Sequence, residues 1–292
     1  MRVALTGANG FTGRYVAQAL AEAGAKCVPL DAELTDKAAI DRAVAETDFD
    51  SLIHLAALAF VAAEDWEGFY TVNQLGTFHL LDAVARKRPG ARCILASSAQ
   101  VYGPGVEGLI AETAPTHPAN HYAVSKLSME LGAAQWRDRL DIVVTRPFNY
   151  TGVGQEPQYL IPKIVDHFRR RAAVIELGNT WVKREFGDVR SVARAYAGIA
   201  LAESVPALVN IATAAVHSID EVIGTLSEIT GHAIQVRVNP AFVRTNDVAV
   251  LGGDPARLRA ALPEWRHHSL AETLTWMCDE PERHQRASRD SA

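Results

Sequence analysis

The chain has 292 residues, of which 48% are hydrophobic and 22% are charged, and its formal net charge is -5. This composition is typical of a globular protein with a sizeable core, and the acidic balance excludes a basic surface for nucleic acid. No apolar run reaches the roughly 18 residues that span a bilayer, and the apolar start at residues 2–5 is too short for a signal peptide. Cys27, Cys93 and Cys278 form no metal-binding spacing and no disulfide framework, so we expect free thiols in a reducing cytoplasm.

The first motif is a glycine-rich turn between a short apolar strand and a helix. Gly7, Gly10 and Gly13 follow the strand at residues 3–5, and apolar residues then recur at helical spacing over residues 15–20. Glycines let the backbone turn sharply and approach a pyrophosphate, whose charge faces the free N–H groups of the helix start. We therefore predict a dinucleotide site here. The alternative is a glycine-rich turn without a ligand.

An acidic residue stands at the end of the second predicted strand, residues 27–30. From this position the carboxylate of Asp31 can accept hydrogen bonds from the adenosine ribose, and it would repel a 2′-phosphate. NAD(H) is therefore favoured, and NADP(H) stays open because Arg14 could reach the same place. The alternative for Asp31 is a solvated strand end. The next helix is expected to begin within residues 33–36, with Thr35 as its cap.

Strands and helices continue to alternate along the first half of the chain. Further strands are expected at residues 51–55, 93–96 and 141–145, with a long helix at residues 73–85. His54 is expected to be a hydrogen-bonded residue at a strand end rather than a catalyst. The alternation predicts an α/β fold with a doubly wound parallel sheet. After Gly152 it ends, and a smaller mixed part follows.

The stretch at residues 120–126 carries the best candidate for catalysis. Tyr122 and Lys126 are four residues apart, which is one turn of a helix. A nearby ammonium favours the phenolate, so such a pair can exchange a proton with a substrate oxygen. Ser97 and Ser98 end the preceding strand, at the edge where such sheets bind ligands. Tyr-x-x-x-Lys alone arises by chance in many chains, and its weight comes from the motifs before it.

Taken in order, these motifs resemble the extended short-chain dehydrogenase/reductase superfamily over residues 1 to about 270. The motifs are the glycine turn, Leu55-Ala56-Ala57, Asn73, Ser98, Tyr122 with Lys126, Arg146-Pro147-Phe148-Asn149 and Arg184-Glu185-Phe186. Within the superfamily, residues 184–190 and 239–248 make the chain similar to GDP-6-deoxy-4-keto-mannose reductases, which make GDP-rhamnose. The resemblance implies a dinucleotide-binding Rossmann domain at residues 1–150 and 187–212, and a smaller mixed α/β nucleotide-sugar domain at residues 151–186 and 213–292.

The resemblance also assigns roles to residues. Tyr122 would exchange a proton with the sugar C4 oxygen, which Ser98 would hold, while Lys126 would bind the nicotinamide ribose and lower the pKa of Tyr122. The cofactor would contact Gly7, Gly10, Phe11, Thr12, Gly13, Asp31, Leu34 (beside the adenine), Leu55, Ala56, Ala57, Asn73, Tyr122, Lys126 and Pro147. The nucleotide sugar would contact Ser98, Gln100, Tyr122, Asn149, Arg184 and Arg244. Ordinary ion pairing is the alternative for the two arginines, and no metal is implied.

Differences from the active-site residues of related enzymes limit the reactions that this chain could catalyse. Related dehydratases have an acid pair shortly after the active-site Ser or Thr, where this chain has Ala99 and Gln100. The epimerase-reductases that make GDP-fucose use Cys and His near the sugar, and Phe148 lies where that His would be. The reaction that these differences leave open is one at the sugar C4 alone. A 4-ketoreductase with a dissociable cofactor is favoured by the short connection after the second strand, and a 4-epimerase that keeps its NAD is the alternative. A cofactor-binding regulator without catalysis is disfavoured by the intact Ser-Tyr-Lys set.

The resemblance further implies a homodimer, packed through the helices at residues 73–85 and 122–136. The second helix offers Leu127, Met129, Leu131 and Trp136 as apolar contact residues, the alternative being that they belong to the core of the same chain. The nucleotide (GDP, UDP or dTDP) and the face of hydride delivery at C4 stay open.

Overall fold

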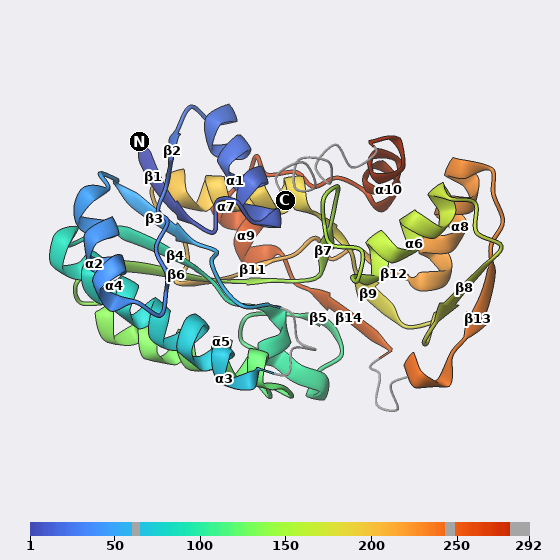
Figure 1. Ribbon diagram of the computed structural model, residues 1–292, viewed down its shortest axis with the longest axis horizontal. Coiled ribbons are helices and arrows are strands. Elements are labelled where there is room, and N and C mark those ends of the chain that lie inside the picture. Colours follow the sequence, from blue (N-terminus) through green and yellow to red (C-terminus); the bar gives the residue numbers. More distant parts are fainter. Residues whose placement is uncertain (60–64, 243–248, 281–292) are drawn as a thin grey trace, which may run out of the picture.

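A six-stranded parallel sheet forms the centre of the computed structural model, which describes residues 1–59, 65–242 and 249–280 (Figure 1). The strands, in spatial order, are β11 (Leu208–Ile211), β6 (Asp141–Pro147), β4 (Arg92–Ala96), β3 (Ser51–His54), β1 (Arg2–Thr6) and β2 (Lys26–Pro29). Every neighbouring pair is parallel. The order runs outward from β1 in both directions, so the predicted doubly wound sheet is confirmed.

Helices cover both faces of this sheet, which explains its apolar strands. Helices α1 (Phe11–Glu22) and α7 (Val189–Leu201) pack on one face and share a core with Leu5 and Ile53. The other face carries α2 (Lys37–Glu46), α4 (Thr77–Lys87) and α5 (His121–Ala133), which pack on Leu52 and Leu95 (Figure 1). Strands that are buried on both sides are apolar at their centres, as in Leu52-Ile53 of β3 and Cys93-Ile94-Leu95 of β4.

Smaller sheets and a second group of helices come mostly from the chain after β6, and β5 is the one described strand of these sheets that precedes it. A four-stranded mixed sheet contains β12 (Val216–Ser218), β9 (Lys183–Glu185), β14 (Val250–Gly253) and β5 (Gly108–Ile110). Two strand pairs are β7 (Tyr150–Thr151) with β10 (Gly187–Asp188), and β8 (Val174–Leu177) with β13 (Gln235–Val238). Helices α6 (Leu160–Arg169), α8 (Ile219–Thr230) and α10 (Leu270–Asp279) share a separate core (Figure 1). The division into two domains at the predicted boundaries stays a prediction.

Short elements complete the described chain. Helix α9 (Ala256–Ala261) packs beside β11, while α3 (Trp66–Gly68) runs into a π-helix, Phe69–Gly76. Single 3₁₀ segments cover Ala99–Gly105, Ala134–Trp136 and Pro240–Phe242. Within the described residues, no helix has the length and apolar character needed to cross a membrane.

Two sequence-based expectations about helices were wrong. The helix after β2 begins at Lys37, and its cap is Asp36, whose carboxylate accepts hydrogen bonds from the backbone of Ala38 and Ala39. Thr35 does not cap it, because its hydroxyl donates to Glu33 at 2.9 Å. A carboxylate can accept from two backbone N–H groups at once, which makes Asp36 the better cap.

The helix expected at residues 73–85 is divided into the π-helix Phe69–Gly76 and α4. The Thr77 hydroxyl donates to the backbone oxygen of Asn73 at 2.7 Å. The π-helix ends where α4 begins, and Asn73, which lies on it, is buried in the protein interior.

Candidate active site

The glycine turn between β1 and α1 has a geometry that only glycine tolerates. Gly7 has a φ of +69°, and a Cβ there would lie 2.9 Å from the backbone nitrogen of Ala56. A Cβ on Gly13 would lie 2.0 Å from the carbonyl oxygen of Gly7. Helix α1 then begins at Phe11 without a side-chain cap. Its first N–H groups are therefore available to an anion, as the dinucleotide prediction requires.

A cavity beside this turn has the position of an adenosine site. It has a volume of ≈ 490 Å³ and is lined by Thr6, Gly7, Leu30, Asp31, Ala32, Glu33 and Ala56. Its two charged lining residues, Asp31 and Glu33, are both acidic and exposed. Leu34 is buried instead, against Gly76 of the π-helix. Arg14 does not line this cavity, and its guanidinium lies 3.4 Å from the backbone oxygen of Gly154.

His54 is a structural residue, as expected from the sequence. Its Nδ1 lies 2.7 Å from Thr6 Oγ1, and its Nε2 lies 3.0 Å from Thr77 Oγ1. Since the Thr77 hydroxyl donates to Asn73, we infer that His54 Nε2 carries the proton and that Nδ1 accepts from Thr6. Burial, assisted by the charge of Lys126, lowers the pKa of His54 to about 3. The ring is neutral and links β1, β3 and α4.

Asn73 connects the strand exit after β3 to the helix that carries Tyr122. Its amide exchanges two hydrogen bonds with the backbone of Leu58, at 2.8 and 2.9 Å. It also donates to Ser125 Oγ at 3.2 Å, and Ser125 donates to the backbone oxygen of Tyr122 at 2.8 Å. Asn73 is thus a buried positioning group for the segment at residues 55–58 rather than a free donor.

Ser98 and Tyr122 meet at the carboxyl edge of the sheet. Ser98 follows β4 and accepts a hydrogen bond from the backbone of Gln100 at 3.2 Å. Tyr122 lies in the first turn of α5, whose cap is Asn120. Burial raises the pKa of Tyr122 to about 12, while a hydrogen bond with Ser98 lowers it. The phenol is therefore protonated at neutral pH and can donate its proton.

Lys126 lies on the same face of α5 and is also buried. Its Nζ donates to the backbone oxygen of Ala96 at 2.7 Å. Burial lowers the pKa of Lys126 to about 8, against a raising effect of Glu130. The expectation of a lowered pKa for Tyr122 is not met, because burial raises that pKa to about 12. The ammonium is directed toward the end of β4 instead.

The predicted substrate residues are distributed over several segments. Gln100 is exposed, and its side chain accepts a hydrogen bond from Asn120 at 3.1 Å. Asn149 is exposed after β6, close to Pro147 at the strand end. Arg184 lies half-buried on β9, and its guanidinium donates to the backbone oxygen of Lys183 at 2.8 Å. Arg244 lies outside the described residues.

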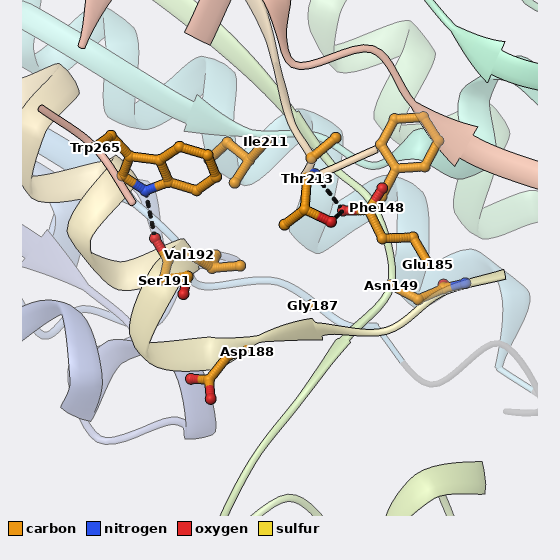
Figure 2. A pocket seen from close by; sticks show the side chains of 11 residues that line it. Phe148, Asn149, Glu185, Gly187, Asp188, Ser191, Val192, Ile211, Thr213 and Trp265 are labelled. Atoms are coloured by element: carbon orange, nitrogen blue, oxygen red, sulfur yellow. Dashed lines mark hydrogen bonds between the residues drawn. The ribbon is translucent and has the colours of Figure 1, made fainter. Parts of the chain in front are cut away.

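A small cavity adjoins Asn149 and is too small for a sugar (Figure 2). Its volume of ≈ 10 Å³ is about that of one water molecule. Glu185 is buried on its wall and accepts from the backbone of Thr213 at 2.6 Å and of Gly253 at 3.2 Å. Burial raises the pKa of Glu185 to about 7, although these hydrogen bonds lower it. Through these hydrogen bonds, Glu185 joins β9 to β14 and to the segment after β11, directly beside Arg184 in the chain.

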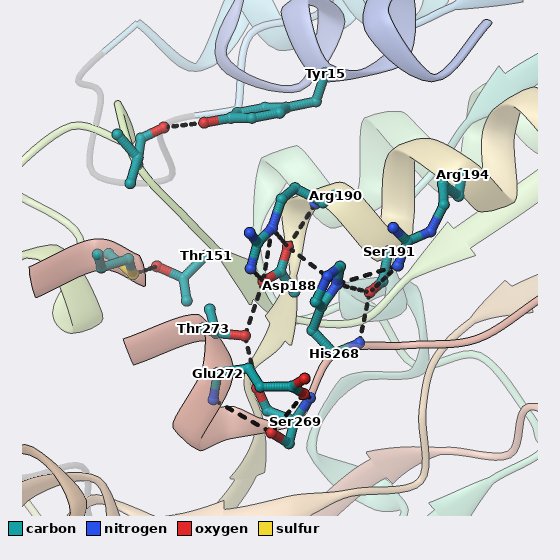
Figure 3. Close-up of polar contacts among 12 residues, drawn as sticks. Tyr15, Thr151, Asp188, Arg190, Ser191, Arg194, His268, Ser269, Glu272 and Thr273 are labelled. Carbon is teal, nitrogen blue, oxygen red and sulfur yellow. Dashed lines mark hydrogen bonds and ion pairs between the residues drawn. The ribbon is translucent and has the colours of Figure 1, made fainter. Parts of the chain in front are cut away.

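A polar cluster fixes α10 against the start of α7 (Figure 3). Asp188 caps α7 and forms an ion pair with Arg190 at 2.7 Å. The Thr273 hydroxyl of α10 donates to the same carboxylate at 2.9 Å. The Arg190 guanidinium lies 3.8 Å from the centre of the Trp276 ring. Burial raises the pKa of Asp188, but the hydrogen bond and charge of Arg190 outweigh it and hold that pKa below its usual value.

Tyr150 is a candidate site residue that the sequence analysis missed. Its hydroxyl lies 2.8 Å from Thr12 Oγ1, and its ring stacks on Phe11 at 6.2 Å. It is also close enough to Tyr122 to raise the pKa of that phenol. The sequence signal that could have pointed to Tyr150 was its place directly after Asn149. Tyr150 lies between the glycine turn and the candidate proton donor.

The apolar residues predicted for a dimer contact divide into two groups. Met129 is buried in the core of the same chain, and Leu127 and Trp136 pack against core clusters. Leu131 is 68% exposed. For the first three residues, the alternative of an intrachain role is therefore the correct one.

The three cysteines are free thiols, and the described part of the chain holds no candidate metal site. Cys27, Cys93 and Cys278 carry no disulfide. Among the residues that the structure describes, no group of three or more His, Cys, Asp or Glu side chains could hold a metal ion.

The site can be compared with known proteins. GDP-6-deoxy-D-talose 4-dehydrogenase of Aggregatibacter actinomycetemcomitans is 32% identical over 287 residues, which cover 95% of this chain and 97% of that protein. GDP-6-deoxy-D-mannose reductase of Pseudomonas aeruginosa is 30% identical over 272 residues, 88% of this chain and 89% of that protein.

Solved structures and a family model agree with these relatives. A structure from Burkholderia cenocepacia is 41% identical, with a TM-score of 0.88 over 95% of this chain and 97% of that one. The structure of RMD from Pseudomonas aeruginosa complexed with NADPH is 28% identical, with a TM-score of 0.86 over 95% and 96%. The model of the NAD dependent epimerase/dehydratase family matches residues 3–212. The chain therefore belongs to the NAD dependent epimerase/dehydratase family.

Proposed function

We propose that this protein reduces the C4 keto group of a nucleotide-activated 6-deoxy-4-keto-hexose, with NAD(P)H as the hydride donor. The observation that carries the proposal is a buried, protonated Tyr122 in hydrogen-bond contact with Ser98 at the carboxyl edge of the sheet. A neutral phenol donates a proton to a developing alkoxide, which is the need of a ketone that receives hydride.

The residues beside Ser98 support chemistry at C4 alone. Ala99 and Gln100 follow it and offer no ionisable group for proton removal at a neighbouring carbon. Phe148 is buried and stacks on Tyr102, with ring centres 6.1 Å apart. Dehydration and epimerisation next to the keto carbon would each need an acid or base here. Simple reduction needs only the proton that Tyr122 supplies.

The names of the two relatives also support a reaction at the sugar C4. One relative is named a 4-dehydrogenase of GDP-6-deoxy-D-talose, which gives C4 as the reacting carbon, and the other is named a GDP-6-deoxy-D-mannose reductase. Talose and mannose differ only in configuration at that carbon, so one 4-keto sugar lies between the two. We infer that a GDP-linked 4-keto-6-deoxy sugar is the first substrate to test.

The residues present fit a nicotinamide dinucleotide. The glycine turn and the start of α1 would hold the pyrophosphate, and the cavity with Asp31 would hold the adenosine. When bound, the cofactor supplies the hydride. Lys126 would hold the nicotinamide ribose through its ammonium, and Ser98 would orient the C4 oxygen toward Tyr122. Asn149 and Arg184 would bind the nucleotide sugar, and Arg244 is assigned to it from the resemblance alone.

The charge of the adenosine cavity favours NAD(H). Two carboxylates, Asp31 and Glu33, line it, and no cationic side chain does. A 2′-phosphate would meet both negative charges. NADP(H) stays in the proposal because the RMD structure holds NADPH. Titration with both reduced cofactors measures the preference.

We also propose a homodimer through the face of α5 and the π-helix that carries Leu75, Val124 and Leu131. These three apolar side chains are 49%, 37% and 68% exposed. Apolar surface of this kind is covered in many stable assemblies. Light scattering of the purified protein tests the proposal, and a monomer that Leu131→Glu leaves unchanged would contradict it.

The deciding experiment uses purified protein, GDP-4-keto-6-deoxy-mannose and either NADH or NADPH, with cofactor oxidation followed by absorbance. We expect stoichiometric oxidation and one 6-deoxyhexose product, whose C4 configuration NMR then assigns. Tyr122→Phe should bind the reduced cofactor but lose turnover. Interconversion of two nucleotide sugars without net cofactor use would support the 4-epimerase instead. Binding without any turnover would support the regulator.

A further inference from the structure

A buried ion pair lies behind the candidate catalytic residues and has no role in the chemistry described so far. Glu130 on α5 and Arg146 on β6 have side chains that are 8% and 6% exposed. Two parallel hydrogen bonds join them, Nε to Oε1 at 3.0 Å and Nη2 to Oε2 at 2.6 Å. Burying two charges costs several kcal/mol of desolvation, which their attraction only partly returns. Stability alone is therefore a weak reason for this pair.

The pair joins the three segments that supply the candidate site. Glu130 lies one helical turn after Lys126 on α5. It accepts a hydrogen bond from the hydroxyl of Ser97, the neighbour of Ser98 at the end of β4. Arg146 lies on β6, three residues before Asn149. One carboxylate is thus in contact with the helix of the proton donor, the strand end of Ser98 and the strand that leads to Asn149.

Arg146 is itself fixed from its other side. Its guanidinium lies 4.8 Å from the centre of the Tyr102 ring, and the Tyr102 hydroxyl donates to Asn210 Oδ1 at 2.7 Å. Asn210 in turn donates to the backbone oxygen of Ile110 at 2.8 Å. The guanidinium therefore has one orientation, and it holds the Glu130 carboxylate in place.

We propose that Glu130 is a positioning residue, which keeps the Lys126 ammonium charged and directed at the end of β4 through its ion pair with Arg146. The proposal rests on the role given to Lys126, but not on the identity of the sugar. Two ionisable groups interact with the charge of Lys126: Glu130, one turn later on α5, and His54 on β3. Glu130 is the anion of the two, since burial and the charge of Lys126 keep His54 neutral.

The electrostatic consequence has a definite sign. Burial alone lowers the pKa of Lys126, and Glu130 opposes this effect, which leaves that pKa at about 8. Removing the carboxylate charge should lower it further, by about one unit or more, as is typical for the loss of a neighbouring opposite charge. Lys126 would then lose its proton near neutral pH. A residue that only held the fold together would not move this titration.

The test is an NMR titration of the free protein labelled with [¹³Cε]lysine. Lys126 is the buried one among six lysines, and Lys126→Met assigns its signal. We expect a wild-type midpoint near pH 8 and a midpoint about one unit or more lower in Glu130→Gln, which keeps the shape of the side chain. An unchanged midpoint in a folded Glu130→Gln protein would overturn the proposal.

Three further variants keep the test decisive. Asp141→Asn breaks the Arg92–Asp141 ion pair (2.6 Å), which joins the first residues of β4 and β6. Since Lys126 lies at the other end of β4, this variant should leave the Lys126 midpoint unchanged. If Glu130→Gln does not fold, the charge-free pair Glu130→Gln with Arg146→Met is compared with Arg146→Met alone, so that the two proteins differ only in the carboxylate. Equal Lys126 midpoints in these two proteins would overturn the proposal. The titration uses no sugar or cofactor, so inactivity toward the proposed substrate does not affect it.

Discussion

The hydrogen bond between Thr12 and Tyr150 connects the glycine turn to the segment after Asn149, and its removal should weaken both. The two hydroxyl oxygens lie 2.8 Å apart, and the Tyr150 ring also stacks on Phe11. Tyr150→Phe keeps the stacking and removes only the hydroxyl. Thr12→Val removes the partner with nearly the same shape. Each single variant leaves one hydroxyl in a partly buried place without its partner.

The expected magnitudes follow from that arrangement. A hydrogen bond contributes about 1 kcal/mol to stability, and a buried hydroxyl left without a partner costs about 1–3 kcal/mol. Each single variant should therefore lower the free energy of unfolding by about 1–2 kcal/mol. The double variant should lose little more than either single variant, so the coupling energy of the cycle should be about 1 kcal/mol or more.

Urea denaturation of the four proteins measures this cycle, and NADH fluorescence titration measures the effect on the dinucleotide site. NADH binding should weaken in both single variants, because the turn is less well fixed. Tyr70→Phe is the matched control, since it removes an exposed hydrogen bond to His121 of 2.9 Å and should change stability by less than about 0.5 kcal/mol. Additive losses in the double variant would refute the argument, because they would mean that the two hydroxyls act independently.

Further predictions concern single residues. Tyr122→Phe should lower turnover by about 10²-fold or more while cofactor binding persists, as stopped-flow and equilibrium titration can measure. Gly13→Ala should abolish cofactor binding because its Cβ would lie 2.0 Å from a backbone oxygen, whereas Gly224→Ala, with open space in α8, should stabilise the protein by about 0.5–1 kcal/mol in urea melts. The pKa of Asp188 is held below its usual value, so its stabilising effect is present above about pH 4 and is lost as the pH falls through the folded-state pKa. Asp188→Asn should therefore be less stable than wild type at pH 7 and approach it at acid pH, and an equal difference at both pH values would contradict this.

Much of the sheet could be predicted from the sequence, because its strands are buried on both sides. Such strands have short apolar centres, such as Leu52-Ile53 in β3 and Cys93-Ile94-Leu95 in β4. The π-helix could not be predicted in this way. Nothing in the local apolar pattern of residues 69–76 distinguishes a π-helical turn from an α-helical one.

The positions of the candidate residues were predictable to the extent that these residues end strands or begin helices. Ser98 follows the end of β4 and Tyr122 lies in the first turn of α5, while their roles stay predictions. Tyr150 and Glu130 were not predicted, because their roles depend on contacts with residues far away in the sequence. Tyr150 contacts Thr12 across 138 positions, and Glu130 contacts Arg146 across 16.

The protonation states of the candidate residues show why spacing alone was insufficient. The Tyr122–Lys126 spacing suggested a phenol made acidic by a neighbouring ammonium, but burial acts on both groups and favours the neutral form of each. A raised phenol pKa keeps Tyr122 ready to give a proton, which suits reduction. A lowered ammonium pKa works against the proposed role of Lys126, because the proposed contact with a ribose needs its charge. A nearby buried anion is therefore a requirement of the site, and Glu130, fixed by Arg146 and Ser97, meets it.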